Sequence, residues 1–452
     1  MDTDNSTGNL MTEGNIWKQI LVFSIPLMLG NLLQQLYNTA DSIIVGNFVG
    51  SNALAAVGSS SSLINLLITF SQGASVGAGV VIAQHIGAKN KKETQDSVHT
   101  ALALALILGL LLTVGGVAAS RSLLLWMNTP EEVLKESDVY LKLYFGGVVF
   151  NVIYNMASGI LNAAGNSKRS LRYLGCASMT NIVLDLFFVA VLRMGVAGAA
   201  VATDISQLLS GILAIRFLMH TQEIYHVELK KIRLKKKNAA TIISMGLPVG
   251  IQNMVISFSN VLVQANINGF GAAAMAGVGA CMKIDVFNMV PITSLSMAIT
   301  TFTGQNCGAG KIKRIWKGMR VTLLMVVLYT AISGGILFAS AGFMIRLFGT
   351  DPEMIAYGEE AMRHLCPFYF LLGILYTLAG VVRGAGKTVP PMLILIASMC
   401  IFRIFWVNCI LPLFGSITGI YLLYPASWGV GLILMVLYVW KGKWMPAELR
   451  KS

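Results

Sequence analysis

The chain has 452 residues, of which 55% are hydrophobic and only 12% are charged, and its formal net charge is +13. This composition excludes an ordinary soluble domain, in which about a quarter of the residues carry a charge. Apolar stretches that each exceed the ~20 residues needed to cross a bilayer recur from end to end, so we expect a multi-pass membrane protein.

The apolar stretches predict about twelve membrane-spanning helices. In chain order these are 16–43, 53–79, 97–119, 139–161, 169–192, 196–219, 240–267, 274–302, 319–341, 357–381, 388–411 and 416–440. The predicted fold is an all-α membrane protein with two pseudo-symmetric six-helix bundles, 16–220 and 239–441. A basic linker, 221–238, joins the bundles, and 1–15 and 442–452 are predicted to be tails.

The second half of the chain repeats the first at an offset of 221 residues. Gly50 to Gly58 aligns with Gly271 to Gly279, and Ala164-Gly165 aligns with Ala385-Gly386 before a polar turn. Six spans per half is an even number, so both halves enter the membrane from the same side. A parallel repeat of this kind is typical of a transporter with a substrate path between its two bundles.

Basic residues are concentrated in the loops that share a side with both termini, including the run from Lys230 to Lys237. The loops of the opposite side hold only Arg121, Lys135, Arg193 and Arg346. The positive-inside rule therefore predicts a plasma-membrane (inner-membrane) protein with both termini in the cytoplasm. The same asymmetry explains the net charge without a nucleic-acid partner, and we interpret the linker as contacting anionic membrane lipid.

The sequence contains no motif for catalysis or nucleotide binding. Its six cysteines form no C-x-x-C pair, and P-loop, H-E-x-x-H and G-x-S-x-G patterns are missing. We therefore predict no enzymatic activity and no cofactor. An ATP-driven pump would need a soluble nucleotide domain, so transport would depend on an ion gradient or on a partner.

Four acids lie well inside the predicted spans, where a carboxylate costs several kcal/mol unless it is protonated, paired or hydrated. They are Asp41, Asp185, Asp204 and Asp285. In the first span, offsets of three and four place Gln34, Asn38 and Asp41 on one stripe, with Tyr37 beside it. A polar stripe on a membrane helix is expected to face the bundle interior or a wet cavity.

Other polar residues of the first half could converge on the same pocket. Asn181 and Asp185 are four residues apart on the fifth span, Thr203 and Asp204 lie on the sixth, and Asn155 lies on the fourth. Two neighbouring acids would share a proton or bind a cation. With an amide and a hydroxyl, the carboxylates would also form an oxygen cage suited to sodium. A helix-packing hydrogen-bond network remains an alternative for these residues.

The second half does not copy these acids. It carries Lys283 and Asp285 on the eighth span and Arg403 on the eleventh, and an ion pair of Asp285 with either cation would allow their burial. Whether Asp285 is a structural pair or a substrate contact stays open. Met254 and Met282 are predicted to help line an adaptable cavity for flat apolar cations.

Pro26 interrupts the helix that carries Asp41, which predicts either a hinge or a static kink. Together, the polar and methionine residues give a predicted substrate cavity. Its residues are Gln34, Tyr37, Asn38, Asn155, Asp204, Met254, Met282 and Asp285.

Several motifs resemble the multidrug and toxic compound extrusion (MATE) family. They are Tyr37 to Ser42, Ala53 to Gly58, Ala83 to Ala88, and the paired turns Asn162 to Ser167 and Arg383 to Thr388. The combination of Asp41 with Asn181 and Asp185 is similar to the DinF-type branch of that family.

The resemblance implies a secondary multidrug antiporter whose two bundles form a V and which exchanges inward-moving protons or sodium for organic, often cationic, drugs. Carried over by motif, Asp41, Asn181, Asp185 and Thr203 would form the coupling site, and the first helix would bend at Pro26 after protonation. The expected partners are small drug-like molecules and membrane lipid, and the expected state is a monomer.

A second hypothesis is a flippase or exporter of a lipid-linked or polyanionic substrate, which the same superfamily contains. Such a protein needs a large, strongly cationic central cavity for pyrophosphate. Only Lys283 and Arg403 are evident candidates for it.

Overall fold

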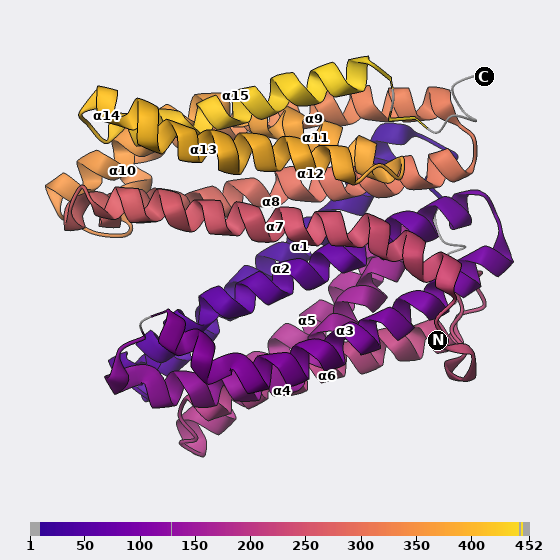
Figure 1. The fold of residues 1–452 in the computed structure, drawn as a ribbon, viewed down its shortest axis with the longest axis horizontal. Coiled ribbons are helices and arrows are strands. Elements are labelled where there is room, and N and C mark those ends of the chain that lie inside the picture. The colour runs from indigo at the N-terminus through magenta and orange to yellow at the C-terminus, as the bar shows by residue number, and fades with distance from the viewer. Residues whose placement is uncertain (1–9, 128, 443, 446–452) are drawn as a thin grey trace. The chain divides into compact units, whose positions relative to one another are not determined.

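The computed structural model describes residues 10–127, 129–442 and 444–445, with the backbone alone at Ser51 and Asn52. Most of the two predicted tails, 1–9, 443 and 446–452, lies outside the described residues. The described part of the chain is built from helices and contains no strand (Figure 1). Twelve of its helical runs are long and apolar enough to cross a membrane, which confirms the predicted fold class.

The six spans of the first half overlap the predicted ranges, and most are longer. They are α1 (Ile16–Phe48), α2 (Ser51–Gly87), α3 (Lys91–Trp126), α4 (Glu131–Ala163), α5 (Ser167–Asp185) with its π-helical continuation η1 (Leu186–Val191), and α6 (Val196–His220). A single 3₁₀ turn, η2 (Leu229–Lys231), lies in the linker.

The spans of the second half are more interrupted. They are α7 (Lys236–Asn268), α8 (Ala272–Gly308), α9 (Ile312–Arg346), α10 (Pro352–Leu365) joined by η3 (Cys366–Phe368) to α11 (Tyr369–Gly384), and α15 (Thr418–Trp440). The eleventh span consists of α12 (Val389–Ile396), η4 (Ala397–Ile401), α13 (Phe402–Phe405), η5 (Trp406–Ile410) and α14 (Leu411–Phe414).

Polar first turns extend several helices beyond their apolar stretches. The side chain of Asn90 caps α3 by accepting a hydrogen bond from Glu93 N, so α3 begins at Lys91 rather than at the predicted residue 97. Its 36 residues span roughly 54 Å at 1.5 Å per residue. This exceeds the ~30 Å hydrocarbon layer, so the ends of such helices project into the headgroup region.

The sequence repeat recurs in the lengths and turns of the helices. α1 and α7 both have 33 residues, and α2 and α8 both have 37. The glycine before each of the longer pair, Gly50 and Gly271, has a φ of +118° and +99°. Glycine adopts such positive values without steric cost, so the two halves enter their second span through the same kind of turn.

The chain forms two compact units, one of which contains 25–250 and the other 11–24 together with the chain from 251 onward. The division therefore falls inside α1, between Ser24 and Ile25, and inside α7, between Gly250 and Ile251. Pro26 and Pro248 each lie within two residues of these points. Each of the two helices thus contributes residues to both units.

Within the first unit, the beginning of α7 packs on α2 through two pairs of glycines. A Cβ on Gly73 would lie 2.3 Å from Gly250 N, and one on Gly77 would lie 2.2 Å from Gly246 N. Both helices carry the small-xxx-small spacing that allows membrane helices to approach backbone to backbone. These glycines fix the first part of α7 to the first unit.

The linker between the halves also packs on the first unit. Tyr225 and Val227 are buried in its hydrophobic core. The backbone N–H of Glu228 donates to His99 Nε2 at 3.0 Å, and Lys235 forms an ion pair with Asp96 of α3. These contacts hold the linker against the first turns of α3.

Candidate functional site

Two acids are buried inside the first unit, on α1 and at the end of α5. The exposed fractions of Asp41 and Asp185 are 9% and 0%, and the two carboxyl groups lie within electrostatic range of each other. Asp41 Oδ1 and both carboxylate oxygens of Asp185 have no hydrogen-bond partner among the described residues. Because buried acceptors normally find a donor, these oxygens are suited to take up a proton or a cation.

Asn181 and Thr203 add an amide and a hydroxyl to this site. Asn181 precedes Asp185 by one turn of α5, and its Nδ2 donates to Thr203 Oγ1 of α6 at 3.4 Å. The carbonyl oxygen of the Asn181 side chain, Oδ1, is buried without a partner in the described part of the chain. The structure thus brings together oxygen atoms of the hard type that sodium and other small cations prefer.

Tyr37 connects α1 with α6 beside the two acids. Its side chain is buried, forms hydrogen bonds with Gln34 and Gln207, and lies within electrostatic range of Asp41 and Asp185. The other two predicted residues of this region lie differently. Asn38 is exposed on α1. On α4, Asn155 Nδ2 donates to Asn151 Oδ1 at 2.7 Å.

Two tyrosines of α4, Tyr140 and Tyr144, belong to the site although the sequence pattern did not single them out. Both are buried, and their ring centroids are 6.4 Å apart. Tyr140 lies within electrostatic range of Asp41, Asp185 and Asp204, and Tyr144 lies within range of Asp41 and Asp204. Their spacing of four residues, with polar tips inside a span, was the available signal.

Asp204 is the third acid of the cluster. It lies on α6, directly after Thr203, and its carboxyl group packs against α4 at Gly147. The candidate site therefore contains three carboxyl groups, with the tyrosines of α1 and α4 in electrostatic range of them. This arrangement makes the interior of the first unit acidic and suits the binding of positive charge.

In the second unit, Asp285 forms no ion pair with Lys283 or Arg403 among the described residues, so the structure does not contain the ion pair that the sequence left open. Arg403 Nε donates to Ser427 Oγ at 3.2 Å and Nη1 donates to Asn260 Oδ1 at 2.9 Å. The Arg403 guanidinium also lies 4.9 Å from the ring centroid of Tyr424. Neutral partners thus satisfy the buried cation, and among the described residues no carboxylate lies within 4.0 Å of it.

Asp285 and Lys283 also have separate surroundings. Asp285 forms a hydrogen bond with Tyr369 of α11. Lys283 is exposed, and its Nζ lies 6.0 Å from the ring centroid of Phe348.

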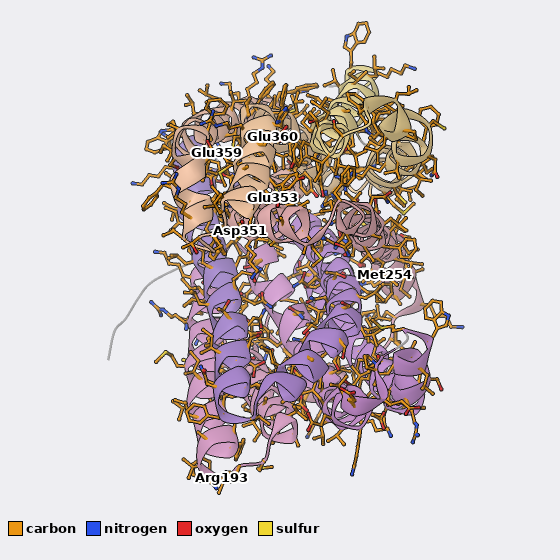
Figure 2. The ribbon with its side chains drawn as sticks, turned by 90° about the vertical axis from the view of Figure 1, so that its left-hand side faces the viewer. Arg193, Met254, Asp351, Glu353, Glu359 and Glu360 are labelled. Carbon is orange, nitrogen blue, oxygen red and sulfur yellow. The ribbon has the colours of Figure 1, made fainter. Side chains whose placement is uncertain are left out.

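The two methionines predicted to line the cavity are both half-buried, Met254 on α7 and Met282 on α8. Figure 2 marks the position of Met254.

Comparisons with known proteins cover both halves of the repeat. The model of the MatE family matches residues 26–187 and 248–407. The probable multidrug resistance protein YpnP of Bacillus subtilis is 30% identical over 393 residues, which cover 87% of this chain and 88% of that protein. The probable multidrug resistance protein NorM of Thermotoga maritima is 29% identical over 399 residues, which cover 86% and 84% of the two chains.

A solved structure described as MATE in the bent conformation has the same fold. It matches with a TM-score of 0.91 at 24% identity and covers 99% of each chain. The MATE-like arrangement predicted from the sequence is thereby confirmed at the level of the fold.

Proposed function

This chain belongs to the MatE family, and we propose that it is a secondary multidrug efflux antiporter that exports organic, often cationic, compounds in exchange for protons or sodium. Its relatives YpnP and NorM are named as multidrug resistance proteins, which supports small drug-like molecules as substrates. The observation that carries the coupling hypothesis is the buried pair Asp41 and Asp185, three of whose oxygens lack a partner among the described residues.

Coupling follows from competition for negative charge. A proton or a sodium ion at Asp41 and Asp185 neutralises the site, and the attraction for an organic cation then falls. Conversely, a bound organic cation makes ion binding less favourable, because the coupling between two ligands is reciprocal. Asn181 Oδ1 and the Thr203 hydroxyl would complete an oxygen shell if the ion is sodium, whereas the carboxyl groups alone suffice for a proton.

Pro26 is proposed as the hinge of α1. Proline has no N–H, so the carbonyl of Val22 loses its helical hydrogen bond. Pro26 also lies where α1 passes from one compact unit to the other. Because α1 carries Asp41 as well, a bend there would connect the ion site to a change between inward-facing and outward-facing states.

A plasma-membrane location with both termini in the cytoplasm is proposed from the charge distribution. The loops assigned to the outer side contain acidic residues and few basic ones. Figure 2 marks Arg193, one of the few basic residues, and the acids Asp351 and Glu353 at the beginning of α10, with Glu359 and Glu360 further along the same helix. The positive-inside rule favours this orientation.

One observation favours the alternative of a lipid-linked or polyanionic substrate. Arg403 is buried with neutral partners only, and Arg383 Nε and Nη2 are buried without any partner among the described residues. An anionic group of a substrate would match these cations. The first unit is acidic, however, and this favours the export of cations.

The proposal is tested by export assays in cells that lack other efflux pumps. Asp41→Asn and Asp185→Asn should lose resistance to cationic drugs while the protein still reaches the membrane. Asp138→Asn is the matched control, because Asp138 lies at the outer part of α4 in an ion pair with the partly exposed Lys142. Full resistance in both site variants would refute ion coupling through this site.

A further inference from the structure

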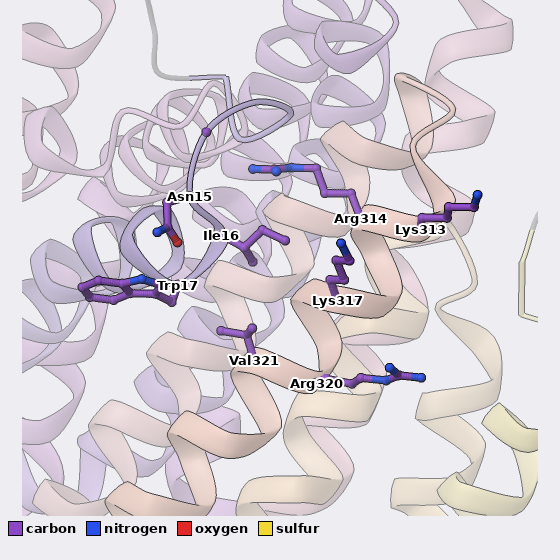
Figure 3. A pocket seen from close by; sticks show the side chains of 9 residues that line it. Asn15, Ile16, Trp17, Lys313, Arg314, Lys317, Arg320 and Val321 are labelled. Carbon is purple, nitrogen blue, oxygen red and sulfur yellow. The ribbon is translucent and has the colours of Figure 1, made fainter.

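A cavity of about 650 Å³ lies within the second unit, between the first residues of α1 and the first turns of α9 (Figure 3). One wall contains Ile16 and Trp17, and the other contains Lys313, Lys317 and Arg320. None of these residues has a part in the ion site described above, which lies in the first unit.

Four basic residues line the cavity, and three of them lack anionic partners among the described residues. Lys313, Lys317 and Arg320 are exposed and form no ion pair with any described residue. Their spacing of four and three residues places them on one face of α9, where like charges repel. Lys313 also lies in the first turn of the helix, where the helix dipole disfavours positive charge. A bound anion would offset both unfavourable effects.

The wall opposite α9 is fixed by hydrogen bonds. Met11 N donates to Gln305 Oε1 at 2.7 Å, and Asn306 Nδ2 donates to the carbonyl of Met11 at 3.1 Å. Arg314 Nε donates to the same carbonyl at 3.2 Å, and its Nη2 donates to Glu13 O at 2.9 Å. Arg314 thus anchors the segment before α1, so the cavity is formed without a ligand.

The cavity combines this positive charge with an apolar surface. Trp17 is 51% exposed although it is a large aromatic residue, Ile16 precedes it on α1, and Val321 adds an apolar side chain from α9. Both walls belong to the ends of candidate membrane spans, which places them at the depth of the lipid headgroups. Tryptophan is enriched at this depth because its ring is amphipathic.

We propose that this cavity binds one anionic phospholipid. Lys317, Arg320 and Lys313 would hold the headgroup phosphate, and Trp17 and Val321 would contact the glycerol and the first acyl carbons. An inorganic anion would gain no binding energy from the apolar residues of the lining. A zwitterionic lipid would bring its own positive charge close to the basic residues of the cavity. The proposal does not depend on the transported substrate or on the coupling ion.

The test measures lipid binding to the purified full-length protein by native mass spectrometry and by its melting temperature. Wild-type protein should bind one molecule of phosphatidylglycerol, with a higher affinity than it has for phosphatidylcholine. The double variant K317Q/R320Q should bind phosphatidylglycerol at least ~tenfold more weakly, and K317R/R320K should keep the binding. The matched control is K91Q/K92Q, which removes two exposed lysines at the start of α3, outside the cavity and outside the basic linker. An equal loss in the control would overturn the proposal, because it would indicate diffuse attraction rather than a site.

The apolar wall separates a lipid from a soluble anion. Trp17→Ala should weaken phosphatidylglycerol binding several-fold, whereas Trp17→Phe should retain most of it. Inorganic phosphate should stabilise neither variant nor the wild type. If phosphate raises the melting temperature as much as phosphatidylglycerol does, or if Trp17→Ala binds the lipid normally, the cavity is not a phospholipid site.

Discussion

The carboxyl group of Asp204 occupies the space that a side chain on Gly147 would need, because a Cβ built on Gly147 would lie 2.0 Å from Asp204 Cγ. The acid of α6 therefore lies directly on the backbone of α4. Tyr144, one turn earlier on α4, lies within electrostatic range of the same carboxyl group. A glycine at this position allows the third acid to join Asp41 and Asp185.

The Gly147→Ala variant tests whether this placement matters for export. The added methyl group should displace the Asp204 carboxyl group and lower export about tenfold, which corresponds to ~1.4 kcal/mol. Gly146→Ala is the control, since no atom lies within 4 Å of a Cβ there. Drug resistance, normalised to the amount of protein in the membrane, is the measurement. Equal resistance of the two variants would show that the position of Asp204 is unimportant.

Tyr140→Phe and Tyr144→Phe should alter ion coupling while they leave the packing of the rings intact. Each change removes a polar hydroxyl that lies within electrostatic range of the acids, so the site should hold a proton or a cation with a different affinity. We expect a several-fold shift in the proton or sodium concentration that gives half-maximal transport. The maximal rate of transport should stay unchanged, which would show that both variants are folded. An unaltered ion dependence in both variants would exclude these tyrosines from the site.

Gly77→Val should destabilise the first unit. Its side chain would meet the backbone of Gly246, and a membrane-helix contact of this kind cannot adjust by a change of rotamer. Overpacking typically costs about 1–3 kcal/mol, so the melting temperature of the purified protein should fall by several degrees. Gly115→Val on α3, where nothing lies within 4 Å, should melt like the wild type. Similar melting of the two variants would contradict the close packing of α2 and α7.

Arg403→Met should reduce stability more than ion-driven export. The change removes the hydrogen bonds of the guanidinium to the buried Ser427, which keeps its bond to Tyr424 O, and to the exposed Asn260. Each such bond contributes about 1 kcal/mol. Because no carboxylate pairs with Arg403, the ion site in the first unit should remain intact. Thermal unfolding and transport of a cationic dye are measured on the same preparation. Loss of transport at full stability would instead favour a substrate contact at Arg403.

The sequence predicted the spans well because each apolar stretch exceeds the bilayer thickness, whereas helix ends depend on polar residues. α3 illustrates this, since Asn90 begins the helix within a polar segment that the apolar pattern does not include. Asn181 and Asp185 could be assigned to one face because their spacing is local. The approach of Tyr140 and Tyr144 to the acids depends on how α4 packs against α1, α5 and α6, and a single sequence does not contain that information.

The open question of an ion pair at Asp285 has a related cause. A buried charge can be stabilised by an opposite charge or by several neutral hydrogen bonds, and the sequence shows only which charges exist. In the folded chain, Tyr369 is the partner of Asp285, while Asn260 and Ser427 satisfy Arg403. These partners come from helices far apart in the sequence, so only the fold reveals them.

Ion-coupled export through the first unit is tested most directly with purified protein in liposomes, a fluorescent organic cation and an imposed gradient of either pH or sodium. Wild-type protein should move the cation when one of the two gradients is present, and Asp41→Asn should abolish this movement while it retains a normal melting temperature. The gradient that drives transport identifies the coupling ion. Gradient-driven transport by Asp41→Asn at the wild-type rate would contradict coupling at this site.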